Sequence, residues 1–333
     1  MGAAMRILLS ILLILLLAPS YSGEEPSPRF SGRPKMTATR VAIDPGDPAN
    51  VRVGQLTYLG GVRLQSPAPA FGGFSSMRTD GKHFALLSDG GHIVLFEMSA
   101  KFHVRHLAFG ALSAGPGTGW LKGSRDSESS TWDPATGRFW VGFEQTNEIW
   151  RYDARGRPAA HLTPLSMVRW AENGGPESMV RLRSGGFIVI SETTRPQGHK
   201  MRAMRDAVLF RGDPTDPRTP TLSFAYRPPD GYDPTDMAEL PDGRLLILNR
   251  RLNLSPALFT AKLVIVDARG IREGAVVQGR EVATLAPPFL HDNFEALAVT
   301  EENGATIVWV ASDDNREWWE WSLLLKFRLE ERQ

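Results

Sequence analysis

A carboxylate recurs in this chain just before a short β-rich run, and a second carboxylate follows the run that pairs with the first. The stretch from residue 173 to 192, NGGPESMVRLRSGGFIVISE, shows the pattern, with Glu177 at the start, a glycine turn in the middle and Glu192 at the end. Two short β-runs around a glycine turn predict a hairpin. Both acids then lie at the open end of the hairpin, where carboxylates can hold a hard divalent cation or share a proton.

The same pattern repeats along the chain, which indicates a repeat architecture. The other copies are FSSM followed by FALLSD, SESS followed by FWVGFE, TDMA followed by LLILNR, and FEAL followed by IVWVASD. Their aligned anchors are Ser75, Glu128, Glu177, Asp236 and Glu295. Further β-runs in each unit, such as residues 93–97 and 104–109, bring the unit to four strands. The sequence therefore predicts an all-β fold, a β-propeller of five four-stranded blades, and leaves a sixth, degenerate blade open.

The last unit has three recognisable β-runs, the third at residues 322–329. Its missing fourth strand is expected from residues 51–64. A strand from the N-terminal part of the chain would then close the ring against the C-terminal blade. Residues 49–333 are expected to form this single propeller domain.

The segments before the propeller have a different composition. Residues 1–22 combine one positive charge, an aliphatic run at residues 7–17 and small residues, which predicts a cleaved secretory signal peptide. The aliphatic run is too short to span a bilayer. Residues 23–48 are rich in proline, glycine and charge and predict a poorly structured lead. We expect an exported protein, periplasmic or secreted, with no stable membrane anchor after cleavage.

Composition excludes several functions. The net charge of +1 gives no indication of nucleic-acid binding. The absence of cysteine excludes disulfides, thiolate metal sites and a cysteine nucleophile. Neither a G-x-S-x-G nor an H-E-x-x-H motif is present. We expect a monomer that acts on a small anionic substrate.

Propeller geometry turns the repeat into a predicted site. The first strand of each blade lines the central channel, so its start and the end of the second strand lie on one face. Many carboxylates around one opening repel one another unless cations neutralise them, and they suit Ca²⁺ or, alternatively, Mg²⁺. The predicted metal ligands are Glu128, Glu177, Asp236, Glu295, Asp89 and Asp313.

Basic residues follow several of the second strands. Arginine and lysine hold phosphate oxygens, so Arg195, Lys200, Arg250 and Arg316 are predicted to bind substrate. Glu177 and Glu295 are predicted to be catalytic, and His291, just ahead of Glu295, is a candidate general acid for the leaving group. Metal, carboxylates and cations together favour phosphoester hydrolysis.

The ordered series of these motifs resembles the bacterial phytase-like family, described as having esterase-like activity of phytase. The resemblance runs from about residue 55 to 326 and includes GYDPTDMAELPDGRLLILNR and DNFEALAV. It implies an exported β-propeller with phosphomonoesterase or phosphodiesterase activity. Its acidic positions carry over to Glu128, Glu177, Asp236 and Glu295, whereas the first repeat departs from the pattern at Ser75.

Three alternatives stay open at this stage. Each acid alone can serve folding by accepting backbone N–H bonds at a strand start. The propeller can be a non-catalytic module that binds an anionic ligand, glycan or protein partner. The same acid ring can also support a metal-dependent lactonase or carboxylesterase.

Overall fold

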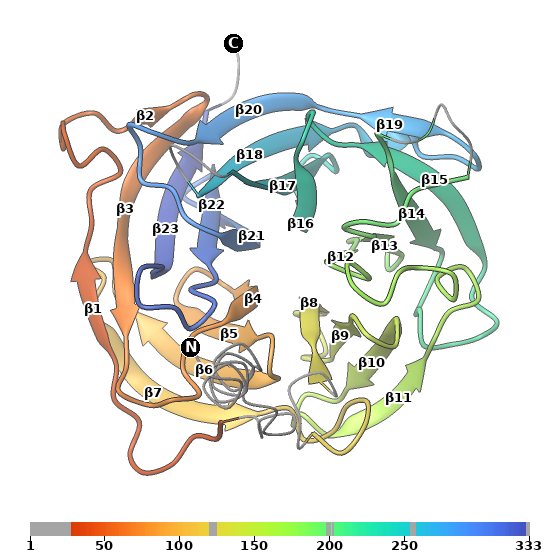
Figure 1. The fold of residues 1–333 in the computed structure, drawn as a ribbon, viewed down its shortest axis with the longest axis horizontal. Helices are drawn as coiled ribbons and strands as arrows, with labels where there is room; N and C mark the ends of the chain where they lie inside the picture. Colours follow the sequence, from red (N-terminus) through yellow and green to blue (C-terminus); the bar gives the residue numbers. More distant parts are fainter. Residues whose placement is uncertain (1–27, 120–124, 198–200, 202, 254–257, 331–333) are drawn as a thin grey trace, which may run out of the picture.

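The computed structural model describes residues 28–119, 125–197, 201, 203–253 and 258–330. In this part of the chain, five β-sheets stand as blades around a central axis (Figure 1). One short 3₁₀ helix, η3, covers Ala268–Gly270. The predicted five-bladed, all-β propeller is confirmed.

Successive hairpins build the blades, numbered here in chain order from the centre outward. Blade 1 contains β4 (Phe74–Thr79), β5 (His83–Ser88), β6 (His92–Met98) and β7 (Val104–Ala111). Blade 2 contains β8 (Ser127–Trp132), β9 (Phe139–Phe143), β10 (Glu148–Tyr152) and β11 (Pro158–Leu162). Blade 3 contains β12 (Ser178–Arg181), β13 (Phe187–Ile190), β14 (Arg205–Phe210) and β15 (Thr221–Arg227), with β19 (Val276–Gln278) parallel to β15. Blade 4 contains β16 (Asp233–Glu239), β17 (Leu245–Leu252), β18 (Phe259–Val266) and β20 (Arg280–Leu285).

Blade 5 is assembled from both halves of the chain. Its inner strands are β21 (Phe294–Glu302), β22 (Ala305–Ser312) and β23 (Ser322–Leu329). The fourth strand is β3 (Leu56–Gln65), which pairs antiparallel with β23 so that Val62 opposes Leu324. The predicted closing strand is therefore confirmed. A turn at Gly54 divides the expected run into β3 and the short β2 (Arg52–Val53).

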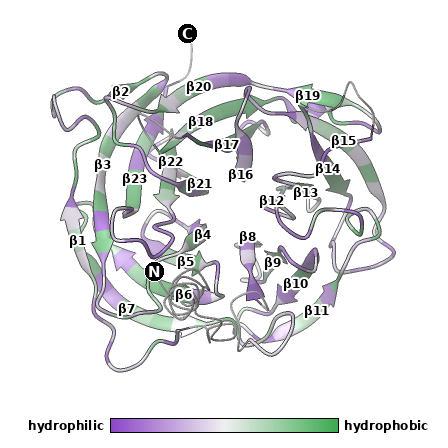
Figure 2. Cartoon of the chain, viewed as in Figure 1, coloured by the Kyte–Doolittle hydropathy of each residue, from purple (hydrophilic) through white to green (hydrophobic). Residues whose placement is uncertain are grey.

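Apolar residues fill the spaces between neighbouring blades. Leu246 of blade 4 and both Phe294 and Val308 of blade 5 belong to one buried cluster. Figure 2 shows this apolar character along the strands, with polar residues on the inner strands β8 and β16. The inner strands β4, β8, β12, β16 and β21 each contact the next around the axis. They form the wall of the channel and place their first residues at one mouth.

Of the lead at residues 23–48, the structure describes residues 28–48, which contain one strand. Within it, β1 (Thr37–Arg40) pairs with β3 as the outermost strand of blade 5. Ile43 is buried, and Phe30 stacks on Phe109 of blade 1. Thr37 and Thr39 favour an extended strand, and pairing with β3 holds that strand at the edge of blade 5.

The predicted signal peptide at residues 1–22 lies outside the described residues. Among those that are described, no helix has the length and apolar character needed to cross a membrane.

Candidate metal centre

At the start of the inner strand, a β-bulge in blades 1, 2, 4 and 5 sets one residue apart from the strand pairing, and in blade 3 Glu177 directly precedes β12. In blade 2, Ser127 pairs with Phe143 and Ser129 with Gly142, which leaves Glu128 as the extra residue. The same shift leaves Ser75 extra in blade 1 and Glu295 extra in blade 5. Bulges of this kind redirect a side chain and often border functional sites.

In blade 4, strand register corrects the sequence alignment by one residue. Pro234 pairs with Asn249 and Asp236 with Leu248, so Thr235 is the bulged residue equivalent to Glu295. The Thr235 hydroxyl donates to Phe294 O at 3.2 Å, just as the Ser75 hydroxyl donates to Ser127 O at 2.6 Å. Two of these four bulge positions therefore carry hydroxyls that tie one blade to the next.

Asp236 consequently faces away from the position that the alignment gave it, because neighbouring strand residues point to opposite sides. Its carboxylate accepts hydrogen bonds from Leu297 N at 2.7 Å and Met237 N at 2.8 Å. Asp236 is buried, and burial raises its pKa well above the usual value. These contacts join blade 4 to blade 5, and the geometry gives no support to its predicted role as a metal ligand.

The end of each second strand supplies another side chain to the same mouth. The backbone N–H of Asp89 donates to Gly73 O at 2.8 Å, and the corresponding bond in blade 2 runs from Glu144 N to Asp126 O at 2.9 Å. Gly73 has φ +67°, and a Cβ there would lie 2.7 Å from Asp89 Oδ1. The glycine-rich lead-in thus lets the backbone approach the acid closely. The equivalent residues in the five blades are Asp89, Glu144, Glu192, Arg250 and Asp313.

The acids of blades 2 and 3 lie close enough to disfavour one another's ionisation. Burial raises the pKa of Glu128 well above its usual value, and the charges of Glu177 and Asp126 raise it further. Burial likewise raises the pKa of Glu177, followed by the charges of Glu192 and Glu144. The structure therefore brings together predicted ligands that lie far apart in the sequence.

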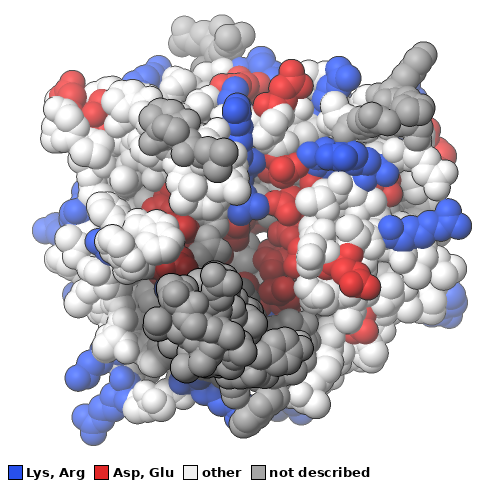
Figure 3. Space-filling model, in the orientation of Figure 1, with Lys and Arg blue, Asp and Glu red and all other residues white. Residues whose placement is uncertain are grey.

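Blades 5 and 1 contribute a second group of acids to this mouth. Burial raises the pKa of Asp313 well above its usual value, and the charges of Glu295 and Asp89 add to the effect. Figure 3 shows Asp and Glu side chains around the hollow at the centre of this face, which we call the acidic mouth.

Two arginines neutralise part of the acidic mouth. Arg250 takes the place of the second acid in blade 4, and its guanidinium donates to Glu295 Oε1 at 2.7 Å and to Glu192 Oε1 at 2.5 Å. Burial raises the pKa of Glu295 to about 6, a rise that the charge of Arg250 opposes. Arg316 donates to Asp89 Oδ1 at 2.9 Å. Both arginines lie at the mouth and are paired with carboxylates, and their role in substrate binding stays a prediction.

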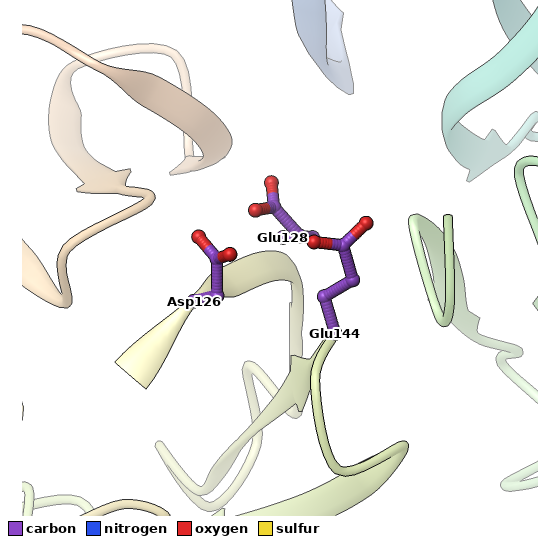
Figure 4. A group of neighbouring side chains, drawn as sticks. All are labelled: Asp126, Glu128 and Glu144. Carbon is purple, nitrogen blue, oxygen red and sulfur yellow. The ribbon is translucent and has the colours of Figure 1, made fainter. Parts of the chain in front are cut away.

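Blade 2 holds the strongest concentration of unneutralised carboxylates. Asp126, Glu128 and Glu144 each offer an oxygen, and these oxygens all lie within 4.8 Å of one another (Figure 4). Asp126 and Glu128 come from the start of β8, and Glu144 from the end of β9. None of the three forms an ion pair with a lysine or arginine among the described residues. Burial raises the pKa of Glu144 to about 7, which the charge of Asp126 reinforces.

Asp126 and Glu144 are not among the metal ligands predicted from the repeat. The position of Asp126 is occupied by Gly73, Gly175, Asp233 and Asn293 in the other blades, so the repeat gives it no acidic consensus. The D-S-E spacing at residues 126–128, together with the acid that ends the paired strand, was the available signal.

The remaining predicted site residues have varied positions. His291 is partly buried, and its Nδ1 lies 2.7 Å from Phe289 O, within its own turn. Arg195 is exposed in the loop after Glu192. Lys200 lies outside the described residues. In the part of the chain that the structure describes, no hydrogen bond or ion pair joins His291 to the acids, so its catalytic role stays a prediction.

Comparisons with known proteins identify one family and several distant structural neighbours. The sequence model of the family described as "Phytase-like: Esterase-like activity of phytase" matches residues 69–316. No curated protein matches the chain.

The structural neighbours are weak matches. Kuenenia stuttgartiensis hydrazine synthase aligns with a TM-score of 0.37 and 13% identity over 73% of this chain and 57% of its own. The β-propeller domain of Myceliophthora thermophila Cps50 (Swd1) aligns with a TM-score of 0.36 and 13% sequence identity, over 72% of this chain and 67% of its own. A Bacteroides caccae protein of unknown function aligns with a TM-score of 0.33 and 11% sequence identity, over 72% of this chain and 65% of its own.

Proposed function

The chain belongs to the Phytase-like family, described by its esterase-like activity, and from this premise we propose that it is an exported, metal-dependent hydrolase of phosphate esters. The observation that carries the proposal is the carboxylate group Asp126, Glu128 and Glu144 at the acidic mouth. Export rests on the composition of residues 1–22 alone.

The donor set of this group fits calcium. Calcium binds carboxylate oxygens at about 2.3–2.6 Å, so two oxygens on one ion stand at most about 5 Å apart. The three oxygens lie within 4.8 Å of one another, which is inside that limit. Magnesium, the alternative ion, binds oxygen at about 2.0–2.1 Å and usually keeps several waters. Three protein ligands leave further coordination positions for water and substrate.

A divalent cation held there would polarise the ester and make bound water more acidic. Residues around this cation site would orient its ligands, transfer a proton and limit the negative charge. Gly174 N donates to Glu144 Oε1, which fixes the orientation of that carboxylate. Glu177 is nine-tenths buried near Glu144, and its proposed task is to exchange a proton with the leaving group. Arg250 and Arg316 hold the opposite side of the mouth and limit its negative charge.

Hydrolysis of carboxylic esters or lactones is the second candidate, and one observation favours it. Arg250 and Arg316 are both engaged with carboxylates, so binding a phosphate requires them to exchange partners. A neutral ester requires no such exchange, and its carbonyl oxygen needs only the cation for polarisation.

The test is hydrolysis of matched phosphate monoesters, phosphate diesters and carboxylic esters in excess Ca²⁺ and again in chelator. We expect release from one class that chelator abolishes and that Glu128→Gln lowers by at least about a hundredfold, the scale seen when a group that stabilises the transition state is removed. Glu301→Gln is the matched control, because Glu301 is exposed on β21.

The outcomes separate the candidates. Phosphate release identifies the first, and turnover of carboxylic esters alone identifies the second. Turnover that is indifferent to chelator and to Glu128→Gln removes the metal centre from the mechanism. No turnover by folded protein indicates a binding propeller instead.

A further inference from the structure

The most exposed large apolar side chains that the structure describes lie on one face of the ring. Among the described residues, five such side chains are at least half exposed: Leu165, Val168, Leu252, Trp318 and Trp319. They come from the loop after β11, the end of β17 and the loop between β22 and β23. Exposed apolar side chains that gather on one face indicate an interaction surface.

Strand direction places all three segments on the face that holds the acidic mouth (Figure 3). Each inner strand begins at this mouth, and the strands that follow it in a blade alternate in direction. The second and fourth strands of a blade therefore end on the same face, as β17, β22 and β11 do. Because these strands belong to blades 4, 5 and 2, the apolar side chains surround the channel instead of forming one patch.

Hydrogen bonds and buried neighbours anchor the loops that carry these side chains. In the loop after β11, Trp170 is buried and its Nε1 donates to Asp206 Oδ2 at 3.0 Å. In the loop before β23, Trp321 N donates to Asp292 Oδ2 at 3.1 Å. Each loop is therefore tied to the blades at one tryptophan, while its other apolar side chains face solvent.

A lipid surface fits this distribution better than a second copy of the chain does. Two copies placed face to face would bring their acidic mouths together, and like charges repel one another. A lipid surface is broad enough to meet loops of three blades at once. Tryptophan favours the interface between membrane and water, and leucine and valine favour the acyl chains.

Arginines adjoin two of the exposed apolar residues. Arg169 follows Val168, and Arg251 precedes Leu252. Both arginines are exposed, and neither forms an ion pair in the part of the chain that the structure describes. An arginine beside an inserted side chain can bind the phosphate of a lipid headgroup. Glu172 is exposed on the same face, so apolar insertion, rather than net charge, has to supply the affinity.

We propose that the face around the acidic mouth binds reversibly to a phospholipid surface, with the five exposed apolar side chains inserted among the lipids. The channel then opens toward the membrane. This contact needs no divalent cation and no turnover, so it stands apart from the proposed hydrolase activity.

Co-sedimentation with phosphatidylcholine vesicles, in chelator, tests the proposal on the chain from residue 23. Residues 1–22 are left out because their aliphatic run would bind lipid by itself, and every described strand is kept. We expect binding that high salt does not remove, because salt screens charge contacts and leaves apolar insertion intact. The double variant Leu165→Ser with Trp318→Ala should bind at least about tenfold more weakly. Val51→Ser is the matched control, because Val51 is exposed beside β2, at the opposite end of the blade.

Fluorescence locates the contact independently of affinity. Brominated phosphatidylcholine quenches tryptophans that reach the acyl chains. We expect it to quench part of the wild-type fluorescence. Replacing both exposed tryptophans, Trp318→Phe with Trp319→Phe, should remove this quenching while the variant still sediments with the vesicles.

The outcomes decide the proposal. A wild type that does not sediment with the vesicles, or that high salt releases, overturns it. Equal affinity of the wild type and the folded double variant also overturns it. If the double variant does not fold, quenching that persists without Trp318 and Trp319 has the same consequence. Since no readout uses turnover, a protein without esterase activity can still confirm the lipid contact.

Discussion

Arg250 Nη1 lies 2.7 Å from Glu295 Oε1, so a cation of blade 4 holds the acid of blade 5 at the channel mouth. The same guanidinium reaches Glu192 of blade 3. One arginine therefore joins three blades at the position where the other four carry acids. Its removal leaves two partly buried carboxylates without their partner.

Arg250→Met is expected to lower the free energy of unfolding by about 3–5 kcal/mol, the cost of breaking a buried ion pair from one side. Arg251→Met is the control, because Arg251 is exposed one residue further along β17. Urea unfolding of both variants measures the difference. Equal stability of the two would show that Arg250 does not link the blades energetically.

Glu128→Gln is expected to stabilise the protein in chelator and to abolish its stabilisation by Ca²⁺. The substitution removes a charge that burial and Glu177 disfavour, and it also removes a ligand of the candidate centre. The midpoint of thermal unfolding, measured with chelator and with excess Ca²⁺, tests both effects. A variant that still gains the wild-type shift from calcium would place the ion elsewhere.

Stability in chelator should depend on pH through Asp292. Burial raises the pKa of Asp292 to about 7, so the folded state holds this proton more tightly than the unfolded chain does. The stabilisation is complete below pH about 4, the ordinary aspartate value, and is lost as the pH rises through about 7. Asp292→Asn should therefore gain stability relative to the wild type across this window. A difference between the two proteins that is constant from pH 4 to 8 would contradict the prediction.

Two tryptophans of blade 5 should differ sharply in their effect on stability. Trp309 is 2% exposed, whereas Trp318 is 84% exposed in the loop before β23. Trp309→Ala should cost about 3–5 kcal/mol, as for other buried aromatic truncations. Trp318→Ala should change stability by less than about 0.5 kcal/mol. A large loss for Trp318→Ala would show that its edge-to-face contact with Trp319, with ring centroids 5.5 Å apart, stabilises the fold.

Removal of β23 should prevent folding, since β3 and β22 both pair with it. A chain that stops before Ser322 is expected to show no cooperative unfolding transition by circular dichroism. A chain that starts at Val41 lacks the outer strand β1 and the segment before it, including Phe30, and should still fold because the five blades keep their other strands. Cooperative unfolding of the first chain would mean that the ring needs no closure.

The repeat was sufficient to predict the ring and its closing strand, because each unit carries two β-runs around a turn at similar spacing. It was insufficient at β16, where Thr235 and Asp236 are adjacent polar residues and only the register of the bulge decides which faces the channel. Asp126 was not predicted as a ligand, because three of the four equivalent positions in the other blades carry no acid. The strand β1 was also not predicted, because it is held by pairing with β3 and lies in a segment whose overall composition does not indicate a strand.

The pairing of β3 with β23 also affects how the protein is made. Thr57 hydrogen-bonds Glu330, 273 residues further along the chain. During synthesis, β3 leaves the ribosome long before its partner, and its open edge must wait while four other blades form. Such an edge is prone to pair with other chains. Blade 5 can close only after β23 has been translated. The ring therefore cannot be completed before nearly the whole chain has been synthesised.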